Sequence, residues 1–386
     1  MQGPVQTIPQ AFSRLKSQGF IRQFDAAQRL NLSEGELIAA HIHQDAFLRT
    51  FSQASNTGID LNSAQANSES AELFAVEDLC ALRLRPDWHA MMASLEPIGE
   101  VMALTRNASC VHEKIGVYQN ATMTERVGVV ASGNIDLRAF YSKWAHGFAV
   151  SEMTTRGRQH SLQFFDVAGI AIHKIYLRED SDVQAYQHLA KHFADGSQQP
   201  GLYTEQLAPK TLEQADQKID VQALHQAWAA LRDTHDFFSL LKTHGVSRVQ
   251  ALRLAQSKFV QQVHCAEVLR VLTAAAAREI PVMVFVGNHG MLQIHTGPIH
   301  KVWYEKPWLN VLDVGFNLHL RMDHIDTAWI VKKPTVDGLV TSFEIFDAQG
   351  DAIAMLFGLR KPGQQELSAW RELLDEIQET QQACAA

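Results

Sequence analysis

Short runs of alternating hydrophobic and polar residues fill two stretches of the chain, residues 101–178 and 282–360, and longer helical periodicities surround them. The first stretch contains VMALTRNASCVHEKIGVY, VGVVASGN, GFAVSEMTT, RQHSLQFFD and GIAIHKIYL, with Gly, Asn and Asp between the runs. A period of two predicts strands, and turn residues between consecutive strands predict hairpins. We therefore expect an antiparallel sheet in each stretch. One short helix is predicted within the first, over IDLRAFYSKWAHG at residues 135–147.

The two strand-rich stretches repeat each other at a constant offset of 181 residues. VMALTRN begins at Val101 and VMVFVGN begins at Val282, and QFFDVAGIA at 163–171 falls on EIFDAQGDA at 344–352. The register holds between these points without a gap. A constant offset over this length indicates an internal duplication.

Helical patterns surround both strand-rich stretches. They cover residues 25–42, 182–194, 221–245, 250–279 and 364–382. In the first of them, Ser33 followed by Glu36 forms a capping-box pattern. The predicted fold class is α+β: a tandem structural repeat in which each half is a large antiparallel β-sheet flanked by helices, with a ligand cleft between the halves. The predicted domains are an N-terminal repeat (1–195), a Gly/Pro/Gln-rich linker (196–210) and a C-terminal repeat (211–386).

Composition narrows the class of protein. Hydrophobic residues make up 46% of the 386, charged residues make up 20%, and the formal net charge is -8. This acidity disfavours a general nucleic-acid surface, including a DNA-binding interpretation of the helices at 25–42. No apolar run approaches the roughly 20 residues that span a bilayer, and the first 20 residues lack a secretory-signal pattern. The four cysteines form no CxxC pair. We therefore expect a cytoplasmic protein without membrane insertion.

The chain shows no G-x-S-x-G, Walker, G-x-G-x-x-G or H-E-x-x-H motif, but it contains 18 histidines. Imidazole is a common ligand of haem iron and of zinc. His188 and His192 are four residues apart on a predicted helix and share one face. His295 with His300, and His41 with His43, are further candidate pairs. A solvated or structural role is the alternative for each histidine, and a zinc site would need a third ligand.

Cationic residues form a second group of candidates. Arg106, in ALTRNAS, is predicted at a sheet end, where its guanidinium would donate hydrogen bonds to a ligand in a cleft or simply face solvent. Lys301, Arg321 and Arg360 lie in the second strand-rich stretch and are candidates to bind ligand carboxylates. Phe237 and Phe238 lie on a predicted helix, where we expect core packing, although one ring could face a flat apolar ligand.

Several long blocks carry a resemblance to a known family. They include VFVGNHGMLQIHTGP, the segment from PWLNVLDVGFNLHLRMDHIDTAWIVKKP to MLFGLRKPG, LTRNASCVHEKIGVY and RLNLSEGELIAA. These blocks resemble the HemS/ChuS family of bacterial cytoplasmic haem-handling proteins, over about residues 25–375. The resemblance implies haem in a cleft between the halves, with a histidine on one side of the iron and an arginine on the other. It implies Arg106 as that arginine and His192, or alternatively His188, as the axial ligand. Lys301, Arg321 and Arg360 are the implied propionate partners.

The function implied by the resemblance is binding of imported haem b, for trafficking or storage in iron acquisition. The alternative is a haem-degrading enzyme that uses an external reductant, with Arg106 on the distal side. Ligation by one protein group makes release of haem easier and leaves the other side open for chemistry, so both functions suit the same site. Expected partners are haem and a haem oxygenase or the inner-membrane haem importer, with no nucleic acid. The protein is expected to be a monomer or homodimer.

Overall fold

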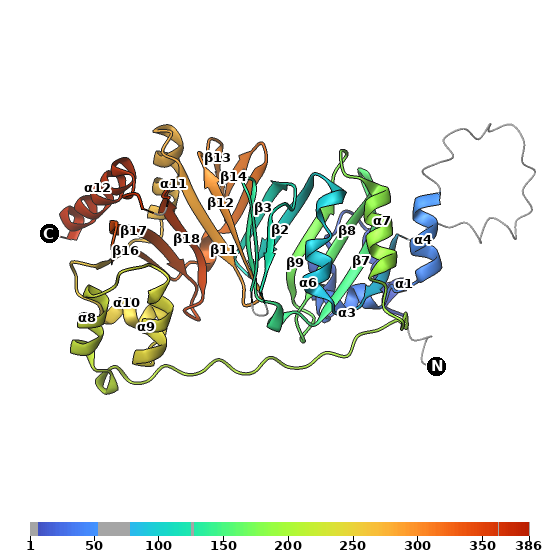
Figure 1. Ribbon diagram of the computed structural model, residues 1–386, viewed down its shortest axis with the longest axis horizontal. Helices are drawn as coiled ribbons and strands as arrows, with labels where there is room; N and C mark the ends of the chain where they lie inside the picture. The colour runs from blue at the N-terminus through green and yellow to red at the C-terminus, as the bar shows by residue number, and fades with distance from the viewer. Residues whose placement is uncertain (1–6, 53–77, 125–126, 362, 386) are drawn as a thin grey trace, which may run out of the picture.

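The computed structural model describes residues 7–52, 78–124, 127–361 and 363–385. Within these residues, two nine-stranded sheets with antiparallel pairing stand next to each other in the middle of the molecule, with helices around them (Figure 1). The α+β tandem-repeat fold class is confirmed. Residues 201–215 form neither helix nor strand and connect the two halves (Figure 1). This segment overlaps the predicted linker, whereas the exact domain boundaries stay a prediction.

Each sheet takes three strands from the other half of the chain. In spatial order, sheet A consists of β1 (Leu79–Leu84), β7 (His146–Thr154), β8 (Gly157–Phe165), β9 (Ala171–Leu177), β2 (Val101–Arg106), β3 (Cys110–Gly116), β15 (Phe316–Arg321), β14 (Trp308–Asp313) and β13 (Val302–Glu305). Sheet B consists of β10 (Val260–Val263), β16 (Thr327–Thr335), β17 (Gly338–Phe346), β18 (Ala352–Gly358), β11 (Val282–Gly287), β12 (Met291–Gly297), β6 (Ile135–Ala139), β5 (Gly128–Ser132) and β4 (Ala121–Met123). The strands β13–β15 and β4–β6 are thus exchanged between the repeats, which ties the two halves into one unit.

The helices lie on both sides of the sheets. They are α1 (Ile8–Ser17), α2 (Gln23–Arg29), α3 (Glu34–Ala39), α4 (Gln44–Ser52), α6 (Trp88–Ala93), α7 (Val183–His192), α8 (Val221–Ala229), α9 (Asp236–His244), α10 (Arg248–Leu254), α11 (Glu267–Ala277) and α12 (Ser368–Ala385). The predicted capping box is confirmed at the start of α3: the amide of Glu36 donates to Ser33 Oγ at 3.2 Å, and the amide of Ser33 donates to Glu36 Oε2 at 2.8 Å. No helix among the described residues is long and apolar enough to cross a membrane.

Two helix predictions were wrong. Residues 135–147 form strand β6, the 3-10 turn Tyr141–Lys143 and the start of β7. Buried Ile135 and Leu137 alternate with half-buried neighbours, and β6 pairs with β12, so the residues follow the period of two that is typical of a strand. The segment 250–279 is also interrupted, because β10 lies between α10 and α11 and pairs with β16. A short strand inside a helix-favouring composition is fixed by this tertiary pairing.

Each sheet has an inner and an outer face. The two inner faces pack against each other in the middle of the molecule, where Thr105 of β2 donates a hydrogen bond to Gln293 of β12 at 2.7 Å. Farther out, α6 and α7 cover the inner face of sheet A, and α11 and α12 cover that of sheet B. The outer faces carry α1–α3 on sheet A and α8–α10 on sheet B. The helices therefore enclose hydrophobic cores against the strands that they cover. On the outer face of each sheet, the strands in the middle of the sheet are only partly covered.

Buried polar groups lie where the two sheets meet. His173 donates from Nδ1 to Thr105 Oγ1 at 2.9 Å and accepts at Nε2 from the hydroxyl of Tyr118 at 2.6 Å. His295 stacks on the ring of Phe316 with 3.8 Å between the ring centroids. Burial lowers the pKa of both His173 and His295 to about 3, because the charged imidazolium loses its hydration. Both histidines are therefore neutral in the folded protein near pH 7.

We expect acid to destabilise the folded protein through these histidines. In the unfolded chain each imidazole has a pKa near 6.5, whereas in the folded chain the pKa is about 3. Between these values only the unfolded chain binds the proton. The free energy of unfolding is therefore highest above about pH 6.5 and decreases as the pH falls toward 3. Lowering the pH from 7 to 5 should cost about 2 kcal/mol per histidine in the free energy of unfolding. Urea unfolding of the wild type and His173→Gln at both pH values tests this. An equal pH dependence in the two proteins would contradict the assignment.

Candidate functional site

The outer faces of the two sheets contain repeat-related residues. Face A is formed by Met102, Leu104, Arg106, Val111, Glu113, Lys174, Tyr176 and His319, which are linked by the cross-strand register of β9, β2, β3 and β15. Face B is formed by Met283, Phe285, Leu292, Ile294, Met355, Phe357 and Arg138, from β18, β11, β12 and β6. Residues directly opposite each other in antiparallel strands point to the same side of a sheet, so each set shares one face.

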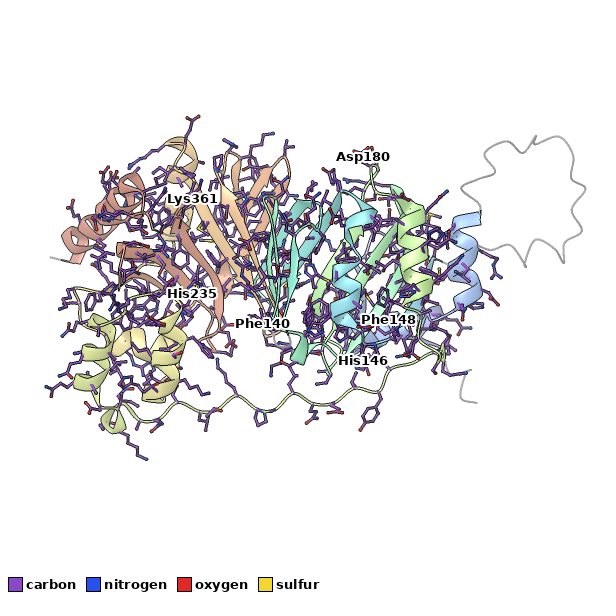
Figure 2. All side chains as sticks on the ribbon, viewed as in Figure 1. Phe140, His146, Phe148, Asp180, His235 and Lys361 are labelled. Atoms are coloured by element: carbon purple, nitrogen blue, oxygen red, sulfur yellow. The ribbon has the colours of Figure 1, made fainter. Side chains whose placement is uncertain are left out.

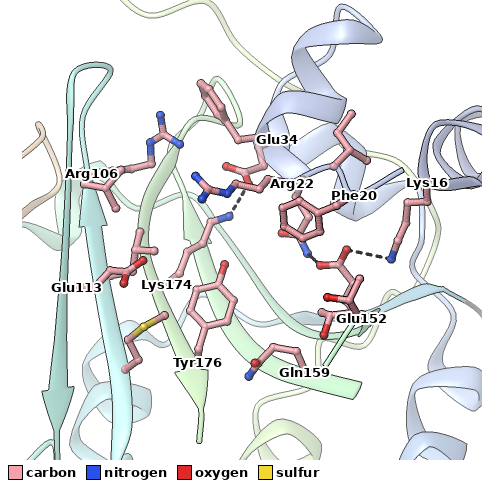
Figure 3. Close-up of a pocket in the computed structure, with 18 of the residues that line it drawn as sticks. Lys16, Phe20, Arg22, Glu34, Arg106, Glu113, Glu152, Gln159, Lys174 and Tyr176 are labelled. Atoms are coloured by element: carbon pink, nitrogen blue, oxygen red, sulfur yellow. Dashed lines mark hydrogen bonds and ion pairs between the residues drawn. The ribbon is translucent and has the colours of Figure 1, made fainter. Parts of the chain in front are cut away.

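Face A forms the floor of a cavity of about 590 Å³ (Figure 3). Its roof is the segment from Lys16 to Phe24, which includes the end of α1 and the start of α2. Lys174 and Glu34 form a buried ion pair on one side of the cavity. On another side, Glu152 accepts hydrogen bonds from Lys16 at 3.2 Å and from Gln23 at 2.7 Å. Two ion pairs, Lys174 with Glu34 and Lys16 with Glu152, therefore line this cavity.

Arg106 also lines this cavity, and it has no carboxylate partner among the residues that the structure describes. Its guanidinium stands 3.8 Å from the centroid of the Phe24 ring, and its Nε donates to the carbonyl of Asn107 at 3.3 Å. Burial lowers the pKa of Arg106, against the raising effect of the Glu34 and Asp25 charges. The guanidinium remains protonated at any physiological pH because the ordinary value is so high.

Face B has a different chemistry. Met283, Phe285, Leu292 and Phe357 are half-buried apolar side chains on adjacent strands, and the Phe285 and Phe357 rings meet edge to face at 5.0 Å. Arg138, from the first half of the chain, opposes Leu292 in the sheet and donates to Asp136 and to the carbonyl of Leu137. Face B is thus an apolar platform with one arginine at its side.

Helix α9 lies over the same outer side of sheet B. Its Phe237 is buried, with the ammonium of Lys333 4.7 Å from the ring centroid, and that ammonium lies 6.0 Å from the ring of Phe357 on face B. By contrast, Phe238 is 75% exposed. The helix that packs beside the platform therefore presents an uncovered aromatic ring.

His235 immediately precedes α9 (Figure 2). Its side chain is 91% exposed, and its Nδ1 lies 2.6 Å from Oδ1 of Asp233. This pairing with the carboxylate leaves Nε2 free. Histidines that bind metals usually donate the other ring N–H to a carboxylate or carbonyl, which fixes the ring and raises its basicity. His235 therefore has a carboxylate partner at Nδ1, as many metal-binding histidines do.

The predicted site residues do not come together. His188 and His192 are exposed on α7, which covers the inner face of sheet A, on the opposite side of that sheet from Arg106. Lys301 is exposed next to β13, and Arg321 pairs with Asp323 at 2.7 Å. Of the predicted residues, Arg106 alone lines the cavity of face A.

Arg360 lies next to the turn between β16 and β17. It lies 3.6 Å from Asp337, and its charge helps to lower the pKa of Asp233, the partner of His235, after the larger effects of the hydrogen bonds from His235. Neither His235 nor Arg138 was among the candidates named from the sequence. The sequence Asp-Thr-His at 233–235, directly before an amphipathic helix, indicates a histidine with a nearby carboxylate. Arg138 lies in the segment 135–147, which was predicted as a helix, so its position in a sheet was not expected. Within the described residues, no group of three or more His, Cys, Asp and Glu side chains forms a metal site.

Comparisons with known proteins give a consistent result. The family model "Haemin-degrading HemS.ChuX domain" matches the chain over residues 67–193 and again over 245–377. The hemin transport protein HemS of Yersinia enterocolitica is 40% identical over 296 residues, which cover 76% of this chain and 84% of that protein. The crystal structure of holo-PhuS, a haem-binding protein from Pseudomonas aeruginosa, superposes with a TM-score of 0.84 at 40% identity, covering 96% of this chain and 98% of the other. The structure of ChuS, an E. coli haem oxygenase, has a TM-score of 0.77 at 32% identity, with 96% and 99% coverage.

Proposed function

Because this chain belongs to the HemS/ChuX family of haemin-degrading domains, we propose that it is a haem-binding protein that accepts imported haem in the cytoplasm. It then passes the haem on or stores it for iron acquisition. Two observations carry this proposal: the apolar platform on the outer face of sheet B, and the imidazole of His235, paired with Asp233, next to the helix that packs on that same face. Haem is a large apolar disc with two carboxylates and a Lewis-acidic iron, and it needs these features in one place.

Face B and α9 match these needs. The platform of Met283, Phe285 and Phe357 contacts one side of the porphyrin, and the exposed ring of Phe238 closes against it. His235 Nε2 binds the iron, while Asp233 holds Nδ1. Arg360, close to this pair, supplies a cation for a propionate. We place the axial ligand at His235 rather than at His192 or His188, because α7 and face B belong to different sheets.

Arg138 completes the site from the other half of the chain. It is carried into sheet B by the exchanged strand β6, so haem bound here contacts both repeats. The guanidinium is a hydrogen-bond donor for a water molecule or another small ligand at the open side of the iron. A single protein ligand on the iron suits a carrier, since one bond must break for release.

We expect Arg138→Gln to keep haem binding within about threefold, because the iron–imidazole bond and the apolar contacts remain. The change should instead alter the visible spectrum and the affinity of the ferric complex for azide, which competes for the open coordination position. Haemin titration and azide titration of the variant, beside Arg106→Gln as the matched control, measure both quantities. If the azide affinity changed with Arg106→Gln and not with Arg138→Gln, Arg106 on face A would be the residue that donates to the iron-bound ligand.

The alternative function is reductive haem degradation, which is favoured by the guanidinium of Arg138 as a hydrogen-bond donor on face B and by the similarity to ChuS. Ascorbate added to the haem complex in air, with and without catalase, separates the two functions. A carrier keeps its Soret absorption when catalase is present and gives its haem to apomyoglobin. Loss of the Soret band despite catalase, without transfer to apomyoglobin, would make degradation the function.

A further inference from the structure

Strand β13 is the last strand of sheet A, and its outer edge is open. The strand at the other end of the sheet, β1, is protected there by bridges from Ile42 and Ala194. Among the residues that the structure describes, β13 has no bridge besides its ladder with β14. An open edge strand presents unpaired N–H and C=O groups and can pair with a strand of another chain.

The ladder with β14 shows which backbone groups of β13 point outward. The amide of Leu312, next to β13 on β14, donates to the carbonyl of Lys301 at 2.9 Å. In an antiparallel ladder, residues that bond to a given neighbour alternate with residues that do not. Every second residue from Lys301 to Glu305 therefore bonds toward β14, and the N–H and C=O groups of Val302 and Tyr304 point away from it. Within the described part of the chain, no hydrogen bond reaches these outward groups.

The side chains of this edge are apolar in the middle and oppositely charged at the two ends. Trp303 is 58% exposed and Tyr304 is 44% exposed. Lys301 before them and Glu305 after them are also exposed. Because side chains alternate along a strand, Lys301, Trp303 and Glu305 point to the same side of the sheet. A cation, an aromatic ring and an anion in this order are complementary to the same strand running in the opposite direction.

We propose that the protein forms a homodimer in which β13 pairs antiparallel with β13 of a second copy, about a twofold axis at Trp303. Val302 of each copy then lies opposite Tyr304 of the other, and their outward N–H and C=O groups bond to each other in both directions. Lys301 lies opposite Glu305 at both ends, and the two Trp303 rings meet at the axis. The paired edges join the nine strands of sheet A in each copy into one continuous sheet.

The charges select this register over its neighbours. A twofold axis at Val302 or at Tyr304 also pairs the outward backbone groups, but it places no opposite charges across from each other. With the axis at Trp303, by contrast, each end of the pair carries a lysine opposite a glutamate. The contact involves sheet A, whereas the proposed haem site lies on sheet B, so dimer formation is measured on haem-free protein and is independent of haem binding.

The test is sedimentation equilibrium of the full-length protein at low salt, at concentrations up to about 1 mM, because a contact of this small size is weak. We expect an equilibrium between monomer and dimer. Lys301→Glu and Glu305→Lys each place like charges opposite each other at both ends, so each should weaken dimerisation about tenfold. An equimolar mixture of the two variants restores opposite charges at both ends and should form a mixed dimer as stable as that of the wild type. Lys191→Glu, which makes the same change of charge at an exposed lysine of α7, should dimerise as the wild type does.

Trp303→Cys gives a second readout that does not depend on charge. Residues opposite each other without a mutual hydrogen bond have Cα atoms about 4.5 Å apart, which suits a disulfide. Mild oxidation should therefore join two chains of Trp303→Cys much faster than two chains of the wild type or of Tyr203→Cys, whose tyrosine is 83% exposed in the connecting segment.

Four results would overturn the proposal. They are a monomer at every concentration, which would leave this edge to a strand of a different protein; a dimer that neither charge variant weakens; a mixture of the two charge variants that does not recover dimerisation; and equal cross-linking of Trp303→Cys and Tyr203→Cys. Thermal unfolding of each variant checks that a lost dimer does not come from lost folding.

Discussion

His235→Ala is expected to weaken haem binding on the order of a hundredfold, about 2.7 kcal/mol, and to shift the Soret band. The substitution removes the imidazole whose Nδ1 is held by Asp233 and whose Nε2 is free, while the side chain contributes nothing to the hydrophobic core because it is 91% exposed. The variant should therefore fold normally. Haemin titration followed by visible absorption measures the affinity and the spectrum together.

Three matched variants show whether this effect belongs to the axial position. Asp233→Asn keeps the imidazole but weakens its support, so we expect a loss of about tenfold. His188→Ala and His192→Ala remove exposed imidazoles from α7 and should leave both affinity and spectrum unchanged. If instead His192→Ala changed the spectrum and His235→Ala did not, the ligand would lie on α7, as the family resemblance first implied.

Glu344→Gln is expected to lower the free energy of unfolding by about 3–5 kcal/mol, the cost of breaking a buried ion pair on one side. Glu344 is fully buried and accepts two hydrogen bonds from Arg248, at 2.7 and 2.8 Å, and one from Lys333 at 2.8 Å. Burial alone would raise the pKa of Glu344, but the charges of Arg248 and Lys333 outweigh it and hold the pKa well below its ordinary value. The substitution leaves Lys333 buried without its counter-charge.

The pH dependence provides an internal check. Burial lowers the pKa of Lys333 to about 8, against the opposing effect of Glu344, and loss of the carboxylate lowers it further. Lys333 binds a proton more weakly in the folded variant than in the unfolded chain, so the variant should regain stability between pH 7 and 10. Glu376→Gln, which breaks an exposed pair with Arg278, should change urea unfolding little. A loss below about 1 kcal/mol for Glu344→Gln would contradict the account of the triad.

Local patterns in the sequence predicted local structure well. The capping box at Ser33, the hairpins of each repeat and the constant offset between repeats depend on neighbouring residues or on self-similarity, and the structure confirms them. The exchange of β4–β6 and β13–β15 was not predictable. A hairpin with the same alternation can join either sheet, and its partner is decided by contacts between residues far apart in the chain.

The site shows the same limit. His188 and His192 lie on a helix as predicted, but periodicity does not reveal which side of a sheet that helix covers, and iron binding by either histidine stays a prediction. Arg106 was correctly expected at a strand end, and its cavity became visible only with the segment that folds over face A. Phe237 is buried in the core, as the helix periodicity predicts, whereas the neighbouring Phe238 is exposed, against that expectation.

The position of the iron tests the central claim most directly. Crystals of the haem complex, measured at the iron absorption edge, give an anomalous peak that marks the metal without reference to any expected contact. We predict one strong peak per chain, over face B and within coordination distance of His235 Nε2, on the side of the sheet that carries Phe357 and Arg138. A peak next to His188 or His192 on α7, or inside the cavity beside Arg106, would contradict the proposed haem site.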